Sequence, residues 1–268
     1  MSNFTTTLHS DTQMQGLIAK ILRYTEGQTT VYIACSGGID SMFLVKLYSE
    51  LLPDKQIVAL IVDHNLQENS SEVAHKTAQI VKSWGVKSTI LEWIHGKVVS
   101  GIEENARNAR YQLITDYCKS NDVQSVAIAH HIDDKIETFL MNSMRGTGLQ
   151  GLTSMQEISN IRGIEFFRPM INEVDKSQIT QFMQEKGFTW FEDLTNADQQ
   201  FIRNKIRHSF NFSSEQKQGI LQTIKNLETE LIDKKKTFIM FGKKSQRKRS
   251  NTLFFQVKST NCLQRKFA

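Results

Sequence analysis

The 268-residue chain has the length of one large domain with a smaller one and is long enough to bury a sizeable core. Its 39% hydrophobic and 23% charged residues are typical of a globular protein. No apolar run approaches the roughly 18 residues that a membrane-spanning helix needs. The first residues lack the basic and apolar segments of a secretory signal. We therefore expect a cytoplasmic protein with no membrane contact.

The net charge of +5 is unevenly distributed along the chain. Residues 234–268 hold 11 of the 33 Lys and Arg residues and none of the 28 Asp and Glu residues, so the preceding segment is acidic overall. A basic tail on an acidic body predicts a contact with nucleic acid, with a solubilising end as the alternative. The three cysteines, Cys35, Cys118 and Cys262, are widely spaced, which predicts reduced thiols and neither a disulfide frame nor a zinc site.

Hydrophobic periodicity predicts strands and helices in alternation through the first two-thirds of the chain. Such alternation indicates an α/β fold, a doubly wound parallel sheet with helices on both faces. The expected strands cover 31–35, 57–62, 88–93, 125–129 and 165–169, and the expected helices cover 13–24, 40–52, 70–84, 101–117 and 133–145.

After Val174 the pattern changes to successive helices, expected over 175–187, 198–210 and 214–233. A weak alternation in the tail, on both sides of KKSQRKRS, predicts a small β-hairpin. The sequence therefore predicts three parts. They are a nucleotide-binding domain over 1–173, a helical domain over 174–233, and a basic tail over 234–268.

The central feature is the stretch from Thr30 to Ser41, TVYIACSGGIDS, which predicts a buried strand, a tight turn and the start of a helix. We expect Gly37 and Gly38 to adopt backbone angles that side chains forbid. The unpaired N–H groups of the first helical turn and the helix dipole favour an anion, most naturally a phosphate. The turn lacks the G-x-x-x-x-G-K-[ST] pattern and the phosphate-binding lysine of a Walker loop.

Polar residues follow three of the expected strands, at 36–41, 63–65 and 130–134. In open parallel sheets, ligands bind beyond the carboxyl ends of the strands, near the topological switch point. We therefore expect all three clusters, including Asp63 and His64, to contribute to one site.

The segment HHIDDKIET places Asp133, Asp134 and Glu137 on one face of a helix. These carboxylates suit Mg²⁺ beside a nucleotide, or an amine substrate held by charge-assisted hydrogen bonds. A structural alternative for Asp133 is the N-cap of its own helix. Adjacent histidines point in different directions and the spacing of a zinc site is missing, so we expect no zinc.

Basic residues cluster in two further segments. EENARNAR places Arg107 and Arg110 on one helical face with Glu103, which indicates either an exposed salt-bridged helix or a site for phosphoryl charge. RNKIRH, residues 203–208, is either a solvated helical face or a phosphate contact.

The turn resembles the S-G-G-x-D-S pyrophosphate loop of the N-type ATP pyrophosphatases. Taken with the later segments, the chain resembles the tRNA(Ile)-lysidine synthetase family over 31–208, about two-thirds of its length. The segments that carry this resemblance are SGGIDS, VDHNL, EENARNARY, HHIDDKIET, RGTGLQGL, RPMI, GFTWFEDLTN and FIRNKIRH.

The resemblance implies a HUP-like (adenine-nucleotide alpha-hydrolase) fold and a two-step ligation that needs ATP and Mg²⁺. ATP adenylates the wobble cytidine of an isoleucine tRNA with a CAU anticodon and releases pyrophosphate. Free L-lysine then displaces AMP to give lysidine. The implied ATP contacts are Ser36, Gly37, Gly38, Ile39, Asp40, Ser41, Asp63 and His64.

The resemblance also implies roles for charged side chains. Asp134 and Glu137 bind or deprotonate the lysine amine, and Mg²⁺ lies near Asp40 and Asp134. Arg107 and Arg110 stabilise charge on the adenylated intermediate. The helical domain over 174–233 and the basic tail are implied to bind the tRNA. The implied tRNA contacts are Arg145, Arg203, Asn204, Arg207, Lys243 and Arg247.

Some features depart from this family or leave alternatives open. Gln67 stands where the family usually has arginine, and the chain is short beside the many members that carry two additional C-terminal domains. A tRNA thiolase is the main alternative, although the cysteines are not paired as its chemistry usually requires. A GMP-synthetase-like ligase would need a glutaminase domain or an ammonia supply. A non-catalytic nucleotide- or RNA-binding module would have no use for Asp40, Asp134 and Glu137. The sequence leaves both a monomer and a homodimer open.

Overall fold

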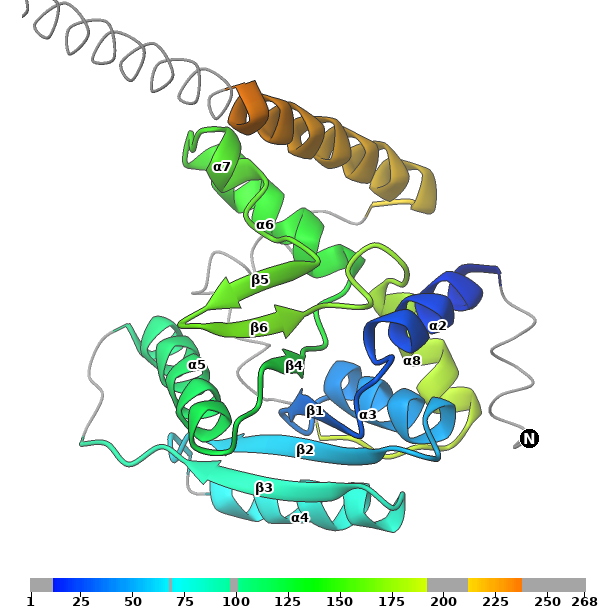
Figure 1. Cartoon of the computed structure of the whole chain (residues 1–268), viewed down its shortest axis with the longest axis vertical. Coiled ribbons are helices and arrows are strands. Elements are labelled where there is room, and N and C mark those ends of the chain that lie inside the picture. The colour runs from blue at the N-terminus through cyan, green and yellow to red at the C-terminus, as the bar shows by residue number, and fades with distance from the viewer. Residues whose placement is uncertain (1–11, 68, 97–100, 192–211, 238–268) are drawn as a thin grey trace, which may run out of the picture.

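The computed structural model describes residues 12–67, 69–96, 101–191 and 212–237. Its centre is a six-stranded sheet in the order β3-β2-β1-β4-β6-β5 (Figure 1). The strands are β1 (Thr30–Cys35), β2 (Gln56–Asp63), β3 (Lys87–Glu92), β4 (Ser125–Ala127), β5 (Ile158–Ile161) and β6 (Ile164–Phe167). The helices are α2 (Thr12–Tyr24), α3 (Ile39–Leu51), α4 (Ser70–Ser83), α5 (Ile102–Ser120), α6 (Ile132–Met144), α7 (Leu149–Leu152) and α8 (Lys176–Glu185).

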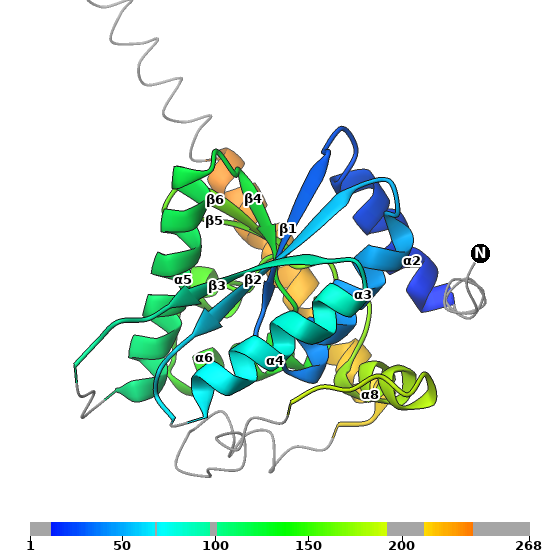
Figure 2. The ribbon, with the colours of Figure 1, turned by 90° about the horizontal axis from the view of Figure 1, so that it is seen from below.

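Both faces of the sheet are covered, as the sequence predicts. On one face, α2, α3, α4 and α8 form an apolar layer in which Leu17, Phe43 and Met183 are fully buried. On the other face, α5 packs Ile114 and Cys118 against the sheet (Figure 2). The continuous apolar run of β2 is explained by this double covering, because both sides of the strand face a helical layer.

The strand order places the switch point between β1 and β4. From β1 the chain moves outward through β2 to β3, and it then returns to add β4 on the other side of β1. Both pairings of β1 are parallel. The segments that follow β1 and β4 therefore leave the same edge of the sheet side by side, where a ligand site is expected.

The sheet is mostly parallel but has one antiparallel edge strand that the sequence prediction missed. β5 and β6 form a hairpin whose two turn residues, Arg162 and Gly163, have φ values of 55° and 91°. Left-handed angles at both positions match the twist of a two-residue hairpin. The Asn160 side chain supports the turn by accepting a hydrogen bond from the Gly163 N–H at 3.0 Å.

After the sheet the chain continues into α8 and a helix over 214–237. α8 packs on α3 through an edge-to-face contact of Phe182 with Phe43, at 5.4 Å between ring centroids. The expected helix over 198–210 and the tail hairpin lie outside the described residues, and the division at 173 and 233 stays a prediction. Within the described residues no helix is long and apolar enough to cross a membrane.

Candidate functional site

The turn between β1 and α3 is held by the hydroxyl of Ser41. This hydroxyl donates to the Gly38 carbonyl at 2.9 Å and accepts the Ser36 N–H at 3.1 Å. Ser41 is buried, so the contacts fix the turn from within. Since α3 begins at Ile39, the N–H groups of its first turn have no acceptor inside the helix and point beyond the carboxyl end of β1.

The two glycines of the turn differ in backbone angle and in the space around them. Gly37 has φ +83°, and a Cβ there would lie 2.5 Å from the Thr77 hydroxyl of α4. Phe191 also donates its N–H to the Gly37 carbonyl at 3.0 Å. Gly38 has φ −72°, and a Cβ would meet only the Ser36 hydroxyl, at 3.5 Å. The prediction that both glycines need forbidden angles is therefore wrong for Gly38.

The β4–α6 junction begins with His131 as the N-cap of α6. Asp134 accepts the His131 N–H at 2.9 Å, which satisfies the cap backbone. The expectation that Asp133 caps this helix is wrong. Asp133 instead accepts the backbone N–H of Lys176 at 2.7 Å and so joins the start of α6 to the start of α8.

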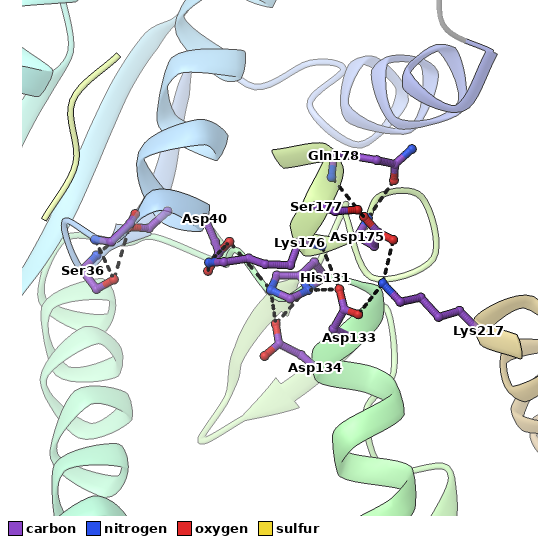
Figure 3. Close-up of polar contacts among 12 residues, drawn as sticks. Ser36, Asp40, His131, Asp133, Asp134, Asp175, Lys176, Ser177, Gln178 and Lys217 are labelled. Atoms are coloured by element: carbon purple, nitrogen blue, oxygen red, sulfur yellow. Dashed lines mark hydrogen bonds and ion pairs between the residues drawn. The ribbon is translucent and has the colours of Figure 1, made fainter. Parts of the chain in front are cut away.

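Three carboxylates surround the buried imidazole of His131 (Figure 3). Its Nε2 lies 3.7 Å from Asp40 and 3.5 Å from Asp134, and its Nδ1 lies 3.4 Å from Asp133. Burial alone would lower the pKa of His131, but the charge of Asp134 and the contacts with Asp133 and Asp40 raise it. Residues from the first helical turns after β1 and β4 thus meet at the switch point.

Two lysines from outside these turns complete the network. Lys176, the first residue of α8, places its Nζ 2.7 and 2.8 Å from the two carboxylate oxygens of Asp40. Lys217, from the helix over 214–237, lies 2.7 Å from both Asp133 and Asp175. Burial favours the neutral acid at Asp133, but contacts with His131 and Lys217 hold the pKa of this carboxyl well below its usual value.

Asp134 and Glu137 lie on α6 as predicted, and the structure buries both side chains. Lys135, between them in sequence, is buried too, and it contacts Asn172 at 2.9 Å and Glu228 of the 214–237 helix at 3.0 Å. The carboxylates of α6 therefore lie in a region shielded from water and rich in paired charges.

Arg107 and Arg110 are both exposed on α5. Arg110 lies 3.4 Å from His64 at the carboxyl end of β2, and Arg107 lies over the Tyr111 ring. Asp63 is turned inward, where its carboxylate accepts hydrogen bonds from the hydroxyls of Ser70 and Ser71. These bonds outweigh the effect of burial and lower the pKa of Asp63.

Arg168 is a site residue to which the sequence prediction gave no role. It is buried just beyond the carboxyl end of β6, next to β4, and donates to His130 Nδ1 at 3.0 Å. Its position at a strand end was the signal that could have found it. No motif marks Lys176 or Lys217, which reach the site from far along the chain.

Oxygen ligands for Mg²⁺ are present but few. Within the described ranges, no group of three or more His, Cys, Asp or Glu side chains is placed to hold a metal. Asp40 and Asp134 nevertheless approach the same atom of His131. Mg²⁺ typically binds through one or two carboxylates together with substrate phosphates, so this pair fits.

Most of the expected RNA contacts cannot be placed. Arg145 is exposed at the end of α6. The other expected RNA contacts lie outside the described residues; they are Arg203, Asn204, Arg207, Lys243 and Arg247. The expected ATP contacts from Ser36 to Ser41 form the β1–α3 turn described above.

A glycine turn that leads into a helix at the switch point of a parallel sheet is typical of nucleotide-binding proteins. A family model described as a PP-loop domain matches residues 7–212, and the chain belongs to this family, which implies ATP binding. A U34-tRNA thiolase from Methanococcus maripaludis shares the fold, with a TM-score of 0.64 at 12% identity over 81% of this chain and 79% of the thiolase.

The curated relatives carry a more specific name than the family model. A tRNA(Ile)-lysidine synthase of Wolbachia sp. subsp. Brugia malayi (strain TRS) is 37% identical over 190 residues, which cover 69% of this chain and 44% of the relative. The enzyme of the same name from Actinobacillus pleuropneumoniae serotype 3 (strain JL03) is 37% identical over 185 residues, covering 69% and 43%. The chain thus spans less than half the length of these relatives.

Proposed function

We propose that this chain ligates free lysine to the 2-position of the wobble cytidine in an isoleucine tRNA with a CAU anticodon, using ATP. The observation that carries this proposal is the meeting of two different groups at one switch point. The β1–α3 turn offers backbone N–H groups to an anion, and α6 offers the buried carboxylates Asp134 and Glu137. Activation of the base by ATP needs groups that bind phosphate, and the later attack by an amine needs groups that bind an ammonium ion.

In the first step, the cytidine O2 attacks the α-phosphate of ATP, and the bond to the leaving pyrophosphate breaks. The turn from Ser36 to Ser41 binds phosphate oxygens through its N–H groups. Arg107 and Arg110, exposed on α5, supply positive charge to the adenylated base. Asp63 supports this site through the loop that carries His64, since its carboxylate is bonded to Ser70 and Ser71.

In the second step, the lysine ε-amine attacks C2 of the base, and the C2–O bond breaks to release AMP. Asp134 and Glu137 receive the incoming ammonium group and take the proton that the amine must lose before it attacks. Their burial supports this role, because a charged ligand is held more strongly away from water.

Mg²⁺, held by Asp40 and Asp134, would offset the negative charge of the phosphates and the leaving pyrophosphate. Arg145, RNKIRH and the basic tail would bind the tRNA backbone, in agreement with their charge. Cys35 and Cys118 are buried free thiols, which supports a cytoplasmic setting and gives no support to sulfur transfer. Gel filtration would test whether the chain forms a homodimer.

The proposal is tested by incubating the purified chain with ATP, Mg²⁺, isoleucine tRNA and radiolabelled lysine. We expect label in the tRNA with one AMP and one pyrophosphate released per lysine, and no label in a transcript whose wobble cytidine is replaced by uridine. If ATP binds but no lysine enters the tRNA, the assignment is wrong. Sulfur incorporation from a sulfide donor would favour the thiolase instead.

The two half-reactions can be separated with Glu137→Gln, which keeps the shape of the side chain and removes its charge. We expect lysine transfer to fall by at least about 100-fold, while release of pyrophosphate on mixing with tRNA and ATP persists for one turnover. Equal loss of both steps would remove Glu137 from the amine step.

A further inference from the structure

The β1–α3 turn has no lysine of its own, yet a lysine lies beside it. Lys176 comes from α8 and contacts both carboxylate oxygens of Asp40, the second residue of α3, at 2.7 and 2.8 Å (Figure 3). Its ammonium group therefore lies at the end of α3 where the N–H groups of the first turn are directed. A Walker loop places its lysine inside the loop sequence, whereas this lysine is 136 residues away from Asp40.

The position of Lys176 is fixed by its surroundings. Its backbone N–H donates to Asp133 at 2.7 Å, and Asp175 caps α8 by accepting the Gln178 N–H at 3.0 Å. Further along α8, Ile179 is fully buried in the apolar layer shared with α3. The first residue of α8 is thus held beside the first turn of α3 by backbone and core contacts that do not involve its own ammonium group.

The side chain of Lys176 is also accessible. It is 45% exposed, compared with 28% for Asp40 and 17% for Lys217. An ammonium group carries three N–H donors, so it can hold Asp40 and a phosphate oxygen at the same time. In the absence of nucleotide, it also reduces the repulsion that the Asp40 carboxylate would exert on an arriving polyphosphate.

We propose that Lys176 is the phosphate-binding lysine of this site, supplied from α8 in place of a lysine within the loop, and that it contacts the polyphosphate of ATP directly. This inference rests on the proposed use of ATP at the β1–α3 turn. It gives α8 a function beyond its packing, because the helix carries the cation that the loop lacks.

The test measures ATP affinity by calorimetry in EDTA, so that no metal contributes, for Lys176→Gln in the natural chain and in an Asp40→Asn background. A direct phosphate contact predicts at least about 10-fold weaker binding in both backgrounds, since a hydrogen bond to a charged group is lost either way. Binding of inorganic pyrophosphate should weaken by a similar factor. Lys176→Arg keeps the charge and should retain most of the affinity.

Lys76→Gln is the matched control, because it removes one lysine from an exposed ion pair with Glu72 on α4 and should leave ATP affinity unchanged. If Lys176→Gln weakens ATP binding only where Asp40 is intact, Lys176 acts through Asp40 and the proposal is wrong. No weakening in either background also overturns it. Thermal unfolding of each variant, compared with Lys176→Arg, separates lost binding from lost folding. A natural chain that binds ATP but transfers no lysine would contradict the proposed function and leave this inference standing.

Discussion

The β1–α3 turn and the β4–α6 junction lie side by side at one edge of the sheet, but they are built from different parts of the chain. The turn depends on backbone: a left-handed glycine, a buried serine hydroxyl and the N–H groups of a helix start. The junction depends on side chains, with His131 among three carboxylates and with lysines that arrive from α8 and the 214–237 helix. One region is local in sequence and the other is assembled from distant segments.

This difference separates two kinds of requirement. A backbone turn tolerates few residues where a position needs a left-handed angle or lies close to a neighbouring helix, and Gly37 does both. A network of charged side chains depends on partners that must all be present, since a buried charge without its partner is costly. Mutations should therefore act on the turn through strain and on the junction through unpaired charge.

The largest effect is expected at Gly37. Gly37→Ala places a Cβ 2.5 Å from the Thr77 hydroxyl on a backbone with φ +83°, which should lower the free energy of unfolding by about 2–4 kcal/mol. Gly38→Ala is the matched control within the same turn. With φ −72° and its nearest contact at 3.5 Å, it loses only the preference for Gly over Ala at the N-cap of α3 and should cost no more than about 1 kcal/mol. Chemical denaturation of both variants measures the difference, and equal losses would contradict the distinction between the two glycines.

The same contrast explains what the sequence could predict. The turn was predictable because S-G-G-x-D-S is contiguous, and the alternation of strands and helices was predictable because apolar runs and polar ends recur regularly along the chain. β5 was missed because a four-residue edge strand with half-exposed side chains has little periodicity. Its Arg-Gly turn lacks the Asn-Gly or Asp-Gly signal that would have indicated a hairpin.

The junction was predicted only in part. HHIDDKIET predicted that Asp134 and Glu137 share a helical face, which α6 bears out. Asp133 was interpreted as a cap, because local spacing cannot show that its oxygens contact Lys176 and Lys217. Pairings across tens of residues depend on how α8 and the 214–237 helix pack. No short motif around either lysine indicates that packing.

The second-largest effect on stability is expected at Arg168, whose buried guanidinium group donates hydrogen bonds to several acceptors. It donates to His130 Nδ1 at 3.0 Å and to the Ser159 hydroxyl at 2.8 Å. Arg168→Gln should lower the free energy of unfolding by about 2–3 kcal/mol, because these acceptors lose a charged donor away from water. Arg23→Gln, at an exposed position on α2, should cost no more than about 0.5 kcal/mol.

A second measurement on this variant separates positioning from general destabilisation. Donation by Arg168 requires an unprotonated Nδ1 on His130, so the proton of the neutral ring is placed on Nε2. Nitrogen chemical shifts of His130 should report this tautomer in the natural chain and a mixture in Arg168→Gln. An unchanged tautomer would show that Arg168 only contributes to packing.

The smallest effect is expected at Asp175, and it should depend on pH. Asn caps helices about as well as Asp, so Asp175→Asn keeps the cap of α8 and removes the charge that faces Lys217. Although burial opposes ionisation, bonds from Lys217 and Ser177 lower the pKa of Asp175 below its ordinary value of 3.8. A lowered folded-state pKa gives stability that is fully present above the unfolded-state value and is lost as the pH falls through the folded-state value.

The natural chain should therefore exceed Asp175→Asn by about 1 kcal/mol at pH 7, and the difference should shrink once the pH falls below about 4. Denaturant unfolding at pH 7, 5 and 3.5 measures this trend. Lys217→Gln provides the reciprocal control, since the Asp175→Asn effect should nearly vanish when its partner is absent. A difference that stays constant from pH 7 to 3.5 would mean that it does not come from the charge of Asp175. The 214–237 helix would then be held to α8 by contacts other than this ion pair.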